Sequence, residues 1–380
     1  MNFSPKKPST IVVGMSGGVD SSVALALLKQ RGHKVIGLFM RNWEEIGEDG
    51  VCTSEADYRD VVSVCEKLDV PYYSVDFVKE YKENVFDSFV EEFKLGHTPN
   101  PDVLCNREIK FNVFFKMAMD LGADYLATGH YCQHLKINGR STLAKGLDAN
   151  KDQSYFLYTM KQQVLEKVVF PIGDLEKPEV RKIALELGLS TSKKKDSTGI
   201  CFIGERNFKN FLSQYISFKR GPFKTLDETS VGEHSGASFY TIGQRKGLGL
   251  GGPGLPWFVV GKDVDTNTVY VERGGDHPAL FSQSLTGMDV SWVGPAPELP
   301  LRCMAKVRYR GSDIPCVVKP LNDSKIEVNF EAPVRAIVSR QSVVFYKDNE
   351  CLGGAIIDSP GENFYQSGRS SLPKIVPIQV

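Results

Sequence analysis

The chain carries no net charge and none of the long apolar segments that mark membrane proteins. Its 46 basic and 46 acidic residues balance, which excludes a uniformly basic surface but leaves room for local basic patches. No apolar run approaches the roughly 18 residues that cross a bilayer. The first residues, MNFSPKKPST, lack the apolar core of a signal peptide and the Arg-rich pattern of a transit peptide. We therefore expect a cytoplasmic protein with no membrane partner.

Cysteine spacing excludes a second group of proteins. No two cysteines are spaced as CxxC, which argues against a zinc ribbon or a local redox motif. A cytoplasmic chain keeps its thiols reduced, so most of its cysteines should be small buried apolar residues. The eight are Cys52, Cys65, Cys105, Cys132, Cys201, Cys303, Cys316 and Cys351.

The first part of the chain alternates between short apolar runs and segments with helical periodicity. Strands that are apolar on both faces form parallel sheets with helices on both sides. We therefore predict an α/β domain over residues 1–216, with a long helix at about 79–95. Its expected strands are 10–15, 34–40, 71–77 and 124–130.

Helical periodicity is missing from most of the remaining sequence. Gly and Pro become frequent, as in GQRKGLGLGGPGLPW, and short alternating runs such as TVYVERG and KIEVNF follow one another. This pattern predicts all-β structure. We expect a small central β domain at 217–284, a C-terminal β-barrel at 285–358 and a flexible tail at 359–380.

Residues 14–22, GMSGGVDSS, form a glycine-rich turn between a strand and a helix. The unpaired N–H groups at such a helix start, together with the helix dipole, bind anions. The stretch is neither a Walker A loop, whose lysine it lacks, nor a GxGxxG dinucleotide loop. Asp20 should repel phosphate unless a metal lies between them, so we expect a nucleotide with Mg²⁺ bridging Asp20 and phosphate oxygens. The alternative is an ordinary helix start capped by Asp20 or Ser21.

Three further stretches carry polar or thiol groups next to expected helices. TPNPDVLCN presents Cys105 ahead of a helix, where the pKa of a thiol is lowered. KKKDSTGICFIGER places Cys201 between two glycines, which suits a mobile thiol. GLDANKDQSYFLY puts residues 151–153 ahead of an aromatic helix. Taken singly, these stretches are also compatible with packed cysteines and an ordinary helix cap.

Together the motifs resemble a known family. SGGVDS at 16–21 is similar to the pyrophosphatase loop of enzymes that cleave ATP between its α and β phosphates, whose fold is adenine nucleotide α-hydrolase-like. The stretches GMSGGVDSS, GLFMRNWEE, TPNPDVLCN, GADYLATGHY, GLDANKDQSYFLY, KKKDSTGICFIGER, GQRKGLGLGG and VRYRGSDIPC occur in the order found in tRNA-specific 2-thiouridylases. The resemblance covers about residues 10–358.

The resemblance implies ATP-dependent transfer of sulfur to C2 of the wobble uridine of tRNAs for lysine, glutamate and glutamine. It assigns catalysis to Cys105, Cys201 and Asp102, with a transient Cys105–Cys201 disulfide. ATP binding falls to Gly14, Met15, Ser16, Gly17, Gly18, Val19, Asp20, Ser21, Met40 and Gly129. Contacts to the target base and the tRNA anticodon arm fall to Asn100, Pro101, Asp102, His130, Lys151, Asp152, Gln153, Arg308, Tyr309, Arg310 and Gln341.

The resemblance also implies a sulfur donor, either a persulfide relay protein or a cysteine desulfurase. Cys201 carries the persulfide, and Cys105 either frees hydrosulfide from it or resolves a disulfide after direct sulfur transfer. The lack of CxxC argues against the iron–sulfur branch of tRNA thiolases. Two rival functions remain open: an ATP-dependent amide ligase with the same loop, and an ATP-responsive tRNA-binding protein without enzymatic activity.

Overall fold

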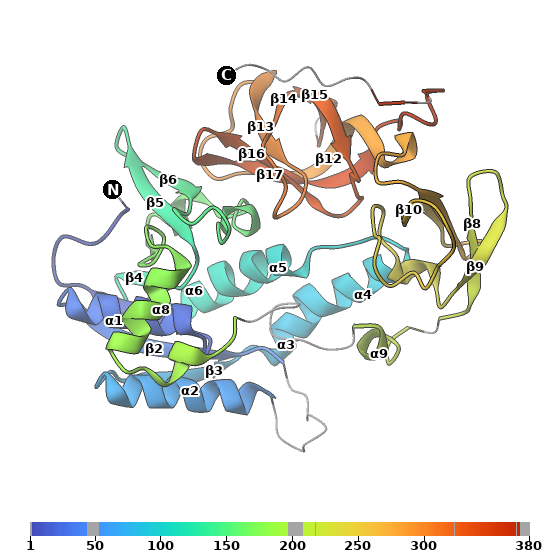
Figure 1. Cartoon of the computed structure of the whole chain (residues 1–380). Coiled ribbons are helices and arrows are strands. Elements are labelled where there is room, and N and C mark those ends of the chain that lie inside the picture. Colours follow the sequence, from blue (N-terminus) through green and yellow to red (C-terminus); the bar gives the residue numbers. More distant parts are fainter. Residues whose placement is uncertain are drawn as a thin grey trace.

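The computed structural model describes residues 2–43, 53–196, 208–216, 218–322, 324–369 and 371–372. Three parts follow one another along the chain: an N-terminal sheet with helices, a small central sheet, and a C-terminal barrel (Figure 1). The predicted fold class, a parallel α/β domain followed by a small mostly β domain and a barrel, is confirmed. Among the described residues, no helix is both long and apolar enough to cross a membrane.

The N-terminal sheet has five parallel strands in the order β3-β2-β1-β4-β7. The central strand β1 is buried on both faces because Ile11, Val12 and Val13 are fully covered. The sequence pattern missed the short fifth strand, β7. The bounds are β1 Thr10–Met15, β2 Lys34–Arg41, β3 Tyr72–Asp76, β4 Tyr125–Thr128 and β7 Val168–Val169.

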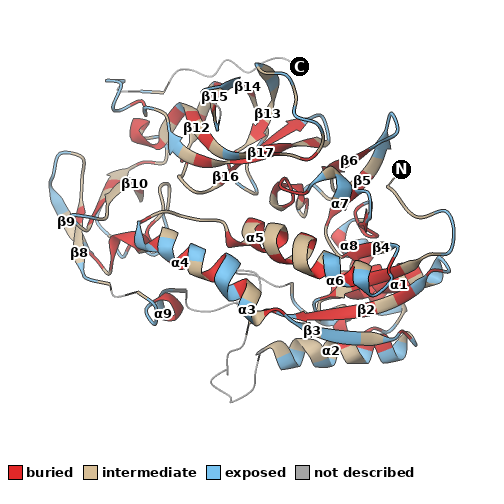
Figure 2. Ribbon diagram, turned by 180° about the vertical axis from the view of Figure 1, so that it is seen from behind, coloured by how far each residue is buried: buried red, intermediate tan, exposed pale blue. Residues whose placement is uncertain are grey.

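Helices cover both faces of this sheet, as Figure 2 shows by the burial of their inner sides. Helices α1, α2 and α8 share a core with Ile11 and Val13, whereas the helical segments of residues 78–120 share one with Val12, Leu38 and Met40. The expected helix at 79–95 is present but contains a π-helical segment, Lys82–Phe86. The bounds are α1 Val19–Gln30, α2 Thr53–Lys67, α3 Val78–Tyr81, α4 Asp87–Lys94, α5 Pro101–Leu104, α6 Phe114–Asp120, α7 Gln162–Leu165, α8 Lys177–Glu186 and α9 Phe208–Leu212.

The central sheet has the order β10-β11-β8-β9, and the barrel is a six-stranded antiparallel sheet that the β12–β17 pairing closes. The hairpin β5–β6 of the N-terminal part adds to the barrel where Glu350 pairs with Ala144. The bounds are β5 Cys132–Ile137, β6 Arg140–Lys145, β8 Gly221–Lys224, β9 Ser230–His234, β10 Trp257–Asp263, β11 Thr268–Arg273, β12 Phe281–Trp292, β13 Leu301–Lys306, β14 Ile314–Pro320, β15 Lys325–Arg335, β16 Ser342–Lys347 and β17 Glu350–Pro360.

The start of the expected tail packs against the barrel. Phe364 is only 3% exposed, and its backbone N–H donates to the carbonyl of Phe281. A bridge between Ser282 and Asn363 adds to this contact. This portion is therefore ordered by burial of an aromatic side chain, while residues 373–380 lie outside the described residues.

Candidate functional site

The glycine loop lies at the carboxyl end of β1, where ligands bind in open parallel sheets. Gly17 has φ +71°, and a Cβ there would come within 2.6 Å of the carbonyl oxygen of Asp57. The loop ends at Gly18, the N-cap of α1, which places Val19, Asp20 and Ser21 in the first helical turn. The predicted ATP-binding stretch 14–21 thus forms a single strand–turn–helix unit against α2.

Serine hydroxyls and a close glycine shape this loop. Ser21 Oγ accepts from the backbone N–H of Ser16 at 3.2 Å, so this hydroxyl contributes to the loop's own geometry. Gly129, beyond β4, approaches closely: a Cβ there would lie 2.7 Å from the backbone nitrogen of Ser21. Met40, on β2, is 8% exposed and belongs to the same buried cluster as Cys105. The predicted adenine side and the predicted thiol therefore lie on the same face of the sheet.

The structure does not favour the expected metal contact of Asp20. Its Oδ1 accepts from the Tyr131 hydroxyl at 2.8 Å and from Lys177 Nζ at 2.7 Å, and its Oδ2 accepts from the same Nζ at 2.9 Å. A metal ion on this carboxylate would face an ammonium group at hydrogen-bond distance from both oxygens. Lys177 thus supplies positive charge at the carboxylate where Mg²⁺ was expected, and the metal contact of Asp20 stays a prediction.

A group of ion pairs joins the loop to the segment that leads to Cys201. Asp196 accepts from Lys151 at 2.6 Å, from Lys177 at 2.8 Å and from Arg181 at 2.6 Å. Although burial raises the pKa of Asp196, the hydrogen bonds from Lys151 and Lys177 hold it down at about 2. Lys194, the middle residue of the lysine run at 193–195, pairs with two carboxylates of α2. Cys201 itself lies outside the described residues.

These ion pairs predict how the stability of the protein responds to pH. Because the pKa of Asp196 is depressed to about 2 in the fold, below roughly 3.9 in an unfolded chain, its contribution is present above pH 4 and is lost as the pH falls from about 4 to 2. In urea unfolding, the free-energy difference between wild type and Asp196→Asn should stay constant from pH 5 to 8 and shrink below pH 4. A difference that vanished between pH 5 and 8 would contradict the assignment.

The helix that carries Cys105 begins earlier than the sequence suggested. Asn100 is the N-cap, and its side chain accepts from the backbone N–H of Val103 at 3.3 Å. Pro101 is buried in the first turn, Asp102 is half-buried beside it, and Cys105 is fully buried one turn later. Cys105 directly follows α5 and begins the π-helical segment Cys105–Val113, which continues the helix, so it does not lie ahead of the helix.

The KDQ stretch is not followed by the expected aromatic helix but by a single 3-10 turn, Ser154–Phe156. Asp152 is 6% exposed, and its carboxylate accepts from the backbone N–H groups of Gly146 and Ser154. The side chain of Gln153 accepts from the backbone of Tyr131 at 2.9 Å. The side chains of Asp152 and Gln153 therefore hold the local chain, and their contact with tRNA stays a prediction.

His130 lies at the end of β4 between two aromatic rings. Its Nδ1 shares a 2.8 Å hydrogen bond with the Thr128 hydroxyl, and Phe111 and Phe170 pack against the imidazole. Burial, and secondly the charge of Lys110, hold the pKa of His130 well below its ordinary value. Any contact of His130 with tRNA would therefore come from a neutral ring.

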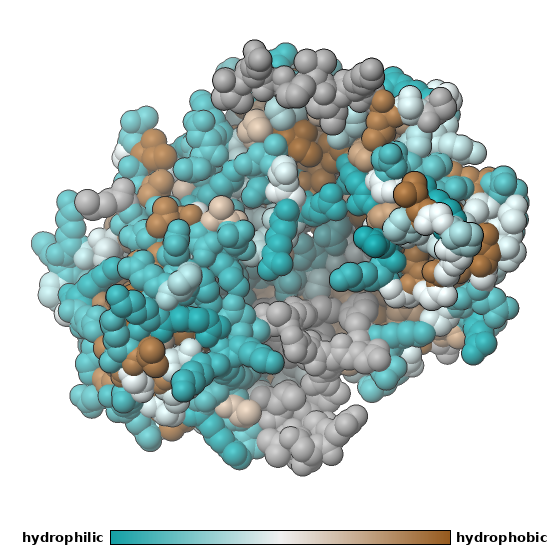
Figure 3. All heavy atoms as spheres, viewed as in Figure 1, coloured by the Kyte–Doolittle hydropathy of each residue, from teal (hydrophilic) through white to brown (hydrophobic). Residues whose placement is uncertain are grey.

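Barrel residues reach the N-terminal domain at two of the predicted tRNA-binding positions. Gln341 Nε2 donates to the carbonyl of Thr98 at 2.6 Å, directly before the Asn100 cap. The ring of Tyr309 lies 4.5 Å from that of Phe156, and its hydroxyl donates to the carbonyl of Lys151 at 3.4 Å. Arg310 packs over Tyr309. Sequence motifs from distant parts of the chain thus meet. Figure 3 shows that most of the described surface on the face seen in Figure 1 is hydrophilic, with scattered hydrophobic side chains.

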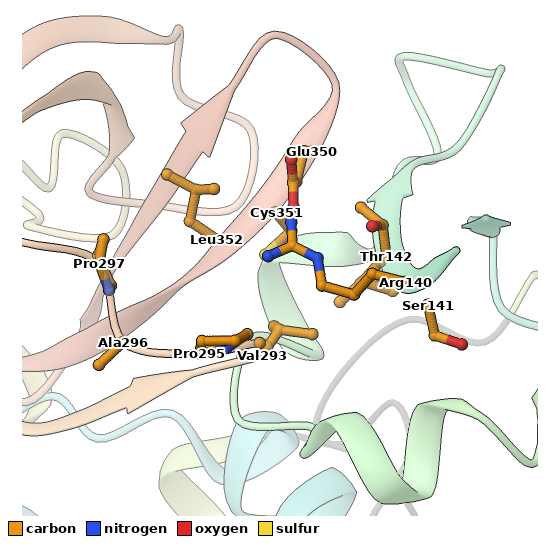
Figure 4. A pocket seen from close by; sticks show the side chains of 12 residues that line it. Arg140, Ser141, Thr142, Val293, Pro295, Ala296, Pro297, Glu350, Cys351 and Leu352 are labelled. Carbon is orange, nitrogen blue, oxygen red and sulfur yellow. Dashed lines mark hydrogen bonds and ion pairs between the residues drawn. The ribbon is translucent and has the colours of Figure 1, made fainter. Parts of the chain in front are cut away.

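A separate cavity of about 280 Å³ lies between the hairpin β5–β6 and the barrel (Figure 4). Its two charged lining residues, Arg140 and Glu350, pair with each other. The cavity therefore presents no unpaired charge to a ligand, and it does not include residues of the glycine loop.

Comparisons with known proteins cover the whole architecture. Three family descriptions match in chain order: the tRNA methyl transferase HUP domain at 9–205, the tRNA methyl transferase PRC-barrel domain at 209–273 and the aminomethyltransferase beta-barrel domain at 282–357. The tRNA-specific 2-thiouridylase MnmA of Protochlamydia amoebophila is 55% identical, over 98% of this chain and 99% of that protein. The chain belongs to the tRNA-specific 2-thiouridylase family.

Other relatives agree with this thiouridylase assignment. The MnmA proteins of Geobacillus thermodenitrificans and of a Staphylococcus aureus strain are each 55% identical, over 96% and 94% of this chain and 98% and 97% of their own. Among solved structures, the U34-tRNA thiolase NcsA from Methanococcus maripaludis, with its [4Fe-4S] cluster, is 20% identical with a TM-score of 0.35, covering 55% of this chain and 65% of its own. That score is too low to carry an argument.

Three residues of the candidate site were not predicted from the sequence. Tyr131 is the last residue of GADYLATGHY and Asp196 the fourth of KKKDSTGICFIGER, so both lie inside motifs that were recognised, although neither was assigned a role. Lys177 stands at the start of α8 in no recognisable motif, and only the fold brings it to Asp20.

Proposed function

We propose that this protein catalyses ATP-dependent 2-thiolation of the wobble uridine in tRNAs for lysine, glutamate and glutamine. The uridine C2 oxygen attacks the α-phosphorus of ATP, and pyrophosphate leaves. The O-adenylated base then accepts sulfur at C2, and AMP leaves with the former C2 oxygen. Adenylation is needed because a carbonyl oxygen is a poor leaving group whereas AMP is a good one.

The loop of residues 14–21 binds the phosphates of ATP, with Met40 beside the adenine and Gly129 closing the pocket. Asn100, Pro101 and Asp102 contact the target base, which leaves its stack to enter the site, and Asp102 acts as general acid or base. Cys201 carries a persulfide that comes from a relay protein or a cysteine desulfurase. Because Asp20 is paired with Lys177, we derive no step through a metal on Asp20.

Two routes lead from the persulfide to 2-thiouridine. In one, the Cys105 thiolate attacks Cys201 Sγ, forms the Cys105–Cys201 disulfide and releases hydrosulfide, which attacks C2. In the other, the terminal persulfide sulfur attacks C2 directly, and Cys105 then attacks Cys201 Sγ to release the thiolated base. Both routes leave the same disulfide, which an external reductant must reopen.

The observation that carries the proposal is a continuous set of contacts from the glycine loop to the barrel. Asp20 pairs with Lys177, Lys177 with Asp196, and Asp196 with Lys151. The backbone of Lys151 then accepts from Tyr309 in the barrel. A nucleotide loop, the start of the Cys201 segment and predicted tRNA contacts are thereby adjacent. An amide ligase has no need for this juxtaposition.

Mass spectrometry of the wobble nucleoside tests the function. Purified protein is incubated with unmodified tRNA, ATP and a persulfide donor in a thiol reductant, and the expected products are 2-thiouridine, AMP and pyrophosphate. Omission of ATP should abolish thiolation. Pyrophosphate release that does not depend on tRNA favours an amide ligase, and tRNA binding without pyrophosphate release favours a non-enzymatic tRNA-binding protein.

A further inference from the structure

We propose that Lys177 is a phosphate-binding residue of the ATP loop, held in position by Asp20. It takes the charge-neutralising role that a metal ion on Asp20 was expected to fill, and that a lysine within the loop fills in Walker A proteins. The inference rests on the proposed use of ATP.

Lys177 reaches the loop from a distant part of the chain. It is the first residue of α8, and its backbone N–H donates to Asp148 Oδ2 at 3.0 Å, which fixes its place. Its side chain is 10% exposed and runs past the ring of Tyr131, 5.6 Å from the ring centre. A lysine seldom buries its side chain in this way unless it is paired.

The ammonium group lies at the start of α1. It is 2.7 and 2.9 Å from the two carboxylate oxygens of Asp20, which belongs to the first turn of the helix. Unpaired N–H groups of that first turn point to the position of a bound anion. Lys177 therefore adds a full positive charge beside backbone donors that carry only partial charges.

Lys177 has two carboxylate partners, one of which an anionic ligand can replace. Asp20 and Asp196 are the carboxylates that pair with Lys177, and Lys151 and Arg181 also pair with Asp196. Asp148 also lies beside Lys177 and accepts from its backbone N–H, so three cations face three carboxylates and the group carries no net charge. An ammonium has three N–H donors, so exchange of Asp196 for a phosphate oxygen leaves the Lys177–Asp20 contact in place.

This position also suits the chemistry. Cleavage between the α and β phosphates builds negative charge on pyrophosphate as it leaves. A lysine that is already oriented and partly removed from water stabilises such charge better than a solvated one. Asp20 then acts as a positioning residue that holds the ammonium, which explains why an acidic residue occurs in a phosphate loop.

Equilibrium binding of ATP to the full chain, measured by calorimetry with EDTA and again with Mg²⁺, tests the proposal. Lys177→Met should raise the Kd for ATP by about 10- to 100-fold in both buffers, as expected for loss of a hydrogen bond to a charged group. Lys177→Arg, which keeps the charge, should recover part of the affinity. The matched control is Lys182→Met, which removes a lysine from the exposed face of the same helix, where it pairs with Glu186, and should bind like wild type.

Asp20→Asn distinguishes between the two candidate sources of positive charge at the loop, the Lys177 ammonium and a Mg²⁺ ion held by Asp20. If Asp20 positions Lys177, this variant should lose affinity by the same factor with and without Mg²⁺. A loss confined to the Mg²⁺ buffer means that Asp20 holds the metal and overturns the proposal. Unchanged ATP affinity of Lys177→Met, with a melting temperature like that of wild type, also overturns it. If Lys177→Met does not fold, the ATP affinities of Lys177→Arg and Asp20→Asn still test whether Lys177 binds phosphate. Absence of ATP binding by wild type in both buffers contradicts the proposed function itself.

Discussion

Replacement of Cys105 by serine is expected to lower the yield of 2-thiouridine at least about 100-fold in a single turnover without added thiol reductant. Both routes of sulfur transfer need the Cys105 thiolate to attack Cys201, and a hydroxyl is a far poorer nucleophile toward sulfur. Pyrophosphate release in the presence of tRNA should continue, since adenylation takes place at the glycine loop. The measurement is mass spectrometry of the nucleoside together with a pyrophosphate assay on the same sample.

Cys132→Ser is the matched control for this experiment. Cys132 and Cys105 are both fully buried in the same cluster, so both variants introduce a buried hydroxyl at a similar cost in folding free energy. Cys132→Ser should thiolate tRNA normally once folded. Equal loss of thiolation in both variants would indicate that burial of the hydroxyl, and not the missing thiol, is responsible.

The Cys105→Ser variant also distinguishes the two routes of sulfur transfer. If the persulfide sulfur attacks C2 directly, Cys105→Ser should stop at a covalent adduct in which the base is joined to Cys201 through two sulfur atoms, and a thiol reductant should release it. If hydrosulfide is the attacking species, neither adduct nor product should form. Gel electrophoresis of labelled tRNA under non-reducing conditions distinguishes these results.

Gly17→Ala is expected to abolish ATP binding, with a Kd raised at least about 100-fold. A methyl group at this position would lie 2.6 Å from the carbonyl oxygen and 2.9 Å from the Cα of Asp57, and both atoms belong to helix backbone that cannot move aside cheaply. The residue also has φ +71°, which costs an L-residue roughly 1–2 kcal/mol. The loop must therefore shift, and its N–H groups then no longer point together at the phosphates of ATP.

Gly32→Ala distinguishes the effect of a positive φ angle from that of the clash with the Asp57 backbone. Gly32 follows α1 and has φ +82°, but a Cβ there meets nothing within 4 Å. This variant should lose about 1 kcal/mol of folding free energy and bind ATP like wild type. Calorimetric titration with ATP and thermal unfolding of both variants check the prediction. An ATP affinity of Gly17→Ala close to that of wild type would mean that the loop does not hold the phosphates.

Local sequence was sufficient for the fold class and for the strand–turn–helix geometry of residues 14–21. The apolar runs around Val12 and Leu38 are buried on both faces because parallel strands between helix layers require it. The glycines of 14–18 end a strand and start a helix as the motif predicts. The start of the Cys105 helix was misplaced: the sequence put Cys105 ahead of it, whereas Asn100 caps a helix that begins at Pro101.

The charge environment of the site could not be predicted from the sequence. Asp20 lies 157 positions from Lys177 along the chain, and no short motif encodes a pairing over such a separation. An isolated aspartate in a phosphate loop suggests a metal, and only the packing of α8 against α1 supplies the cation. The contact between Gln341 and Thr98 likewise depends on how the barrel docks.

By itself, then, the sequence determined what depends on neighbouring residues: strand and helix periodicity, the left-handed glycine turn and the order of motifs that identifies the thiouridylase family. Tertiary structure decided which charges and hydrogen-bonding groups meet. It paired Asp20 with Lys177, turned Asp152 inward to the backbone and placed Tyr309 beside Lys151. The physical reason is that electrostatic and hydrogen-bond partners are selected by distances of a few ångströms in space, whereas local patterns specify only how the backbone turns.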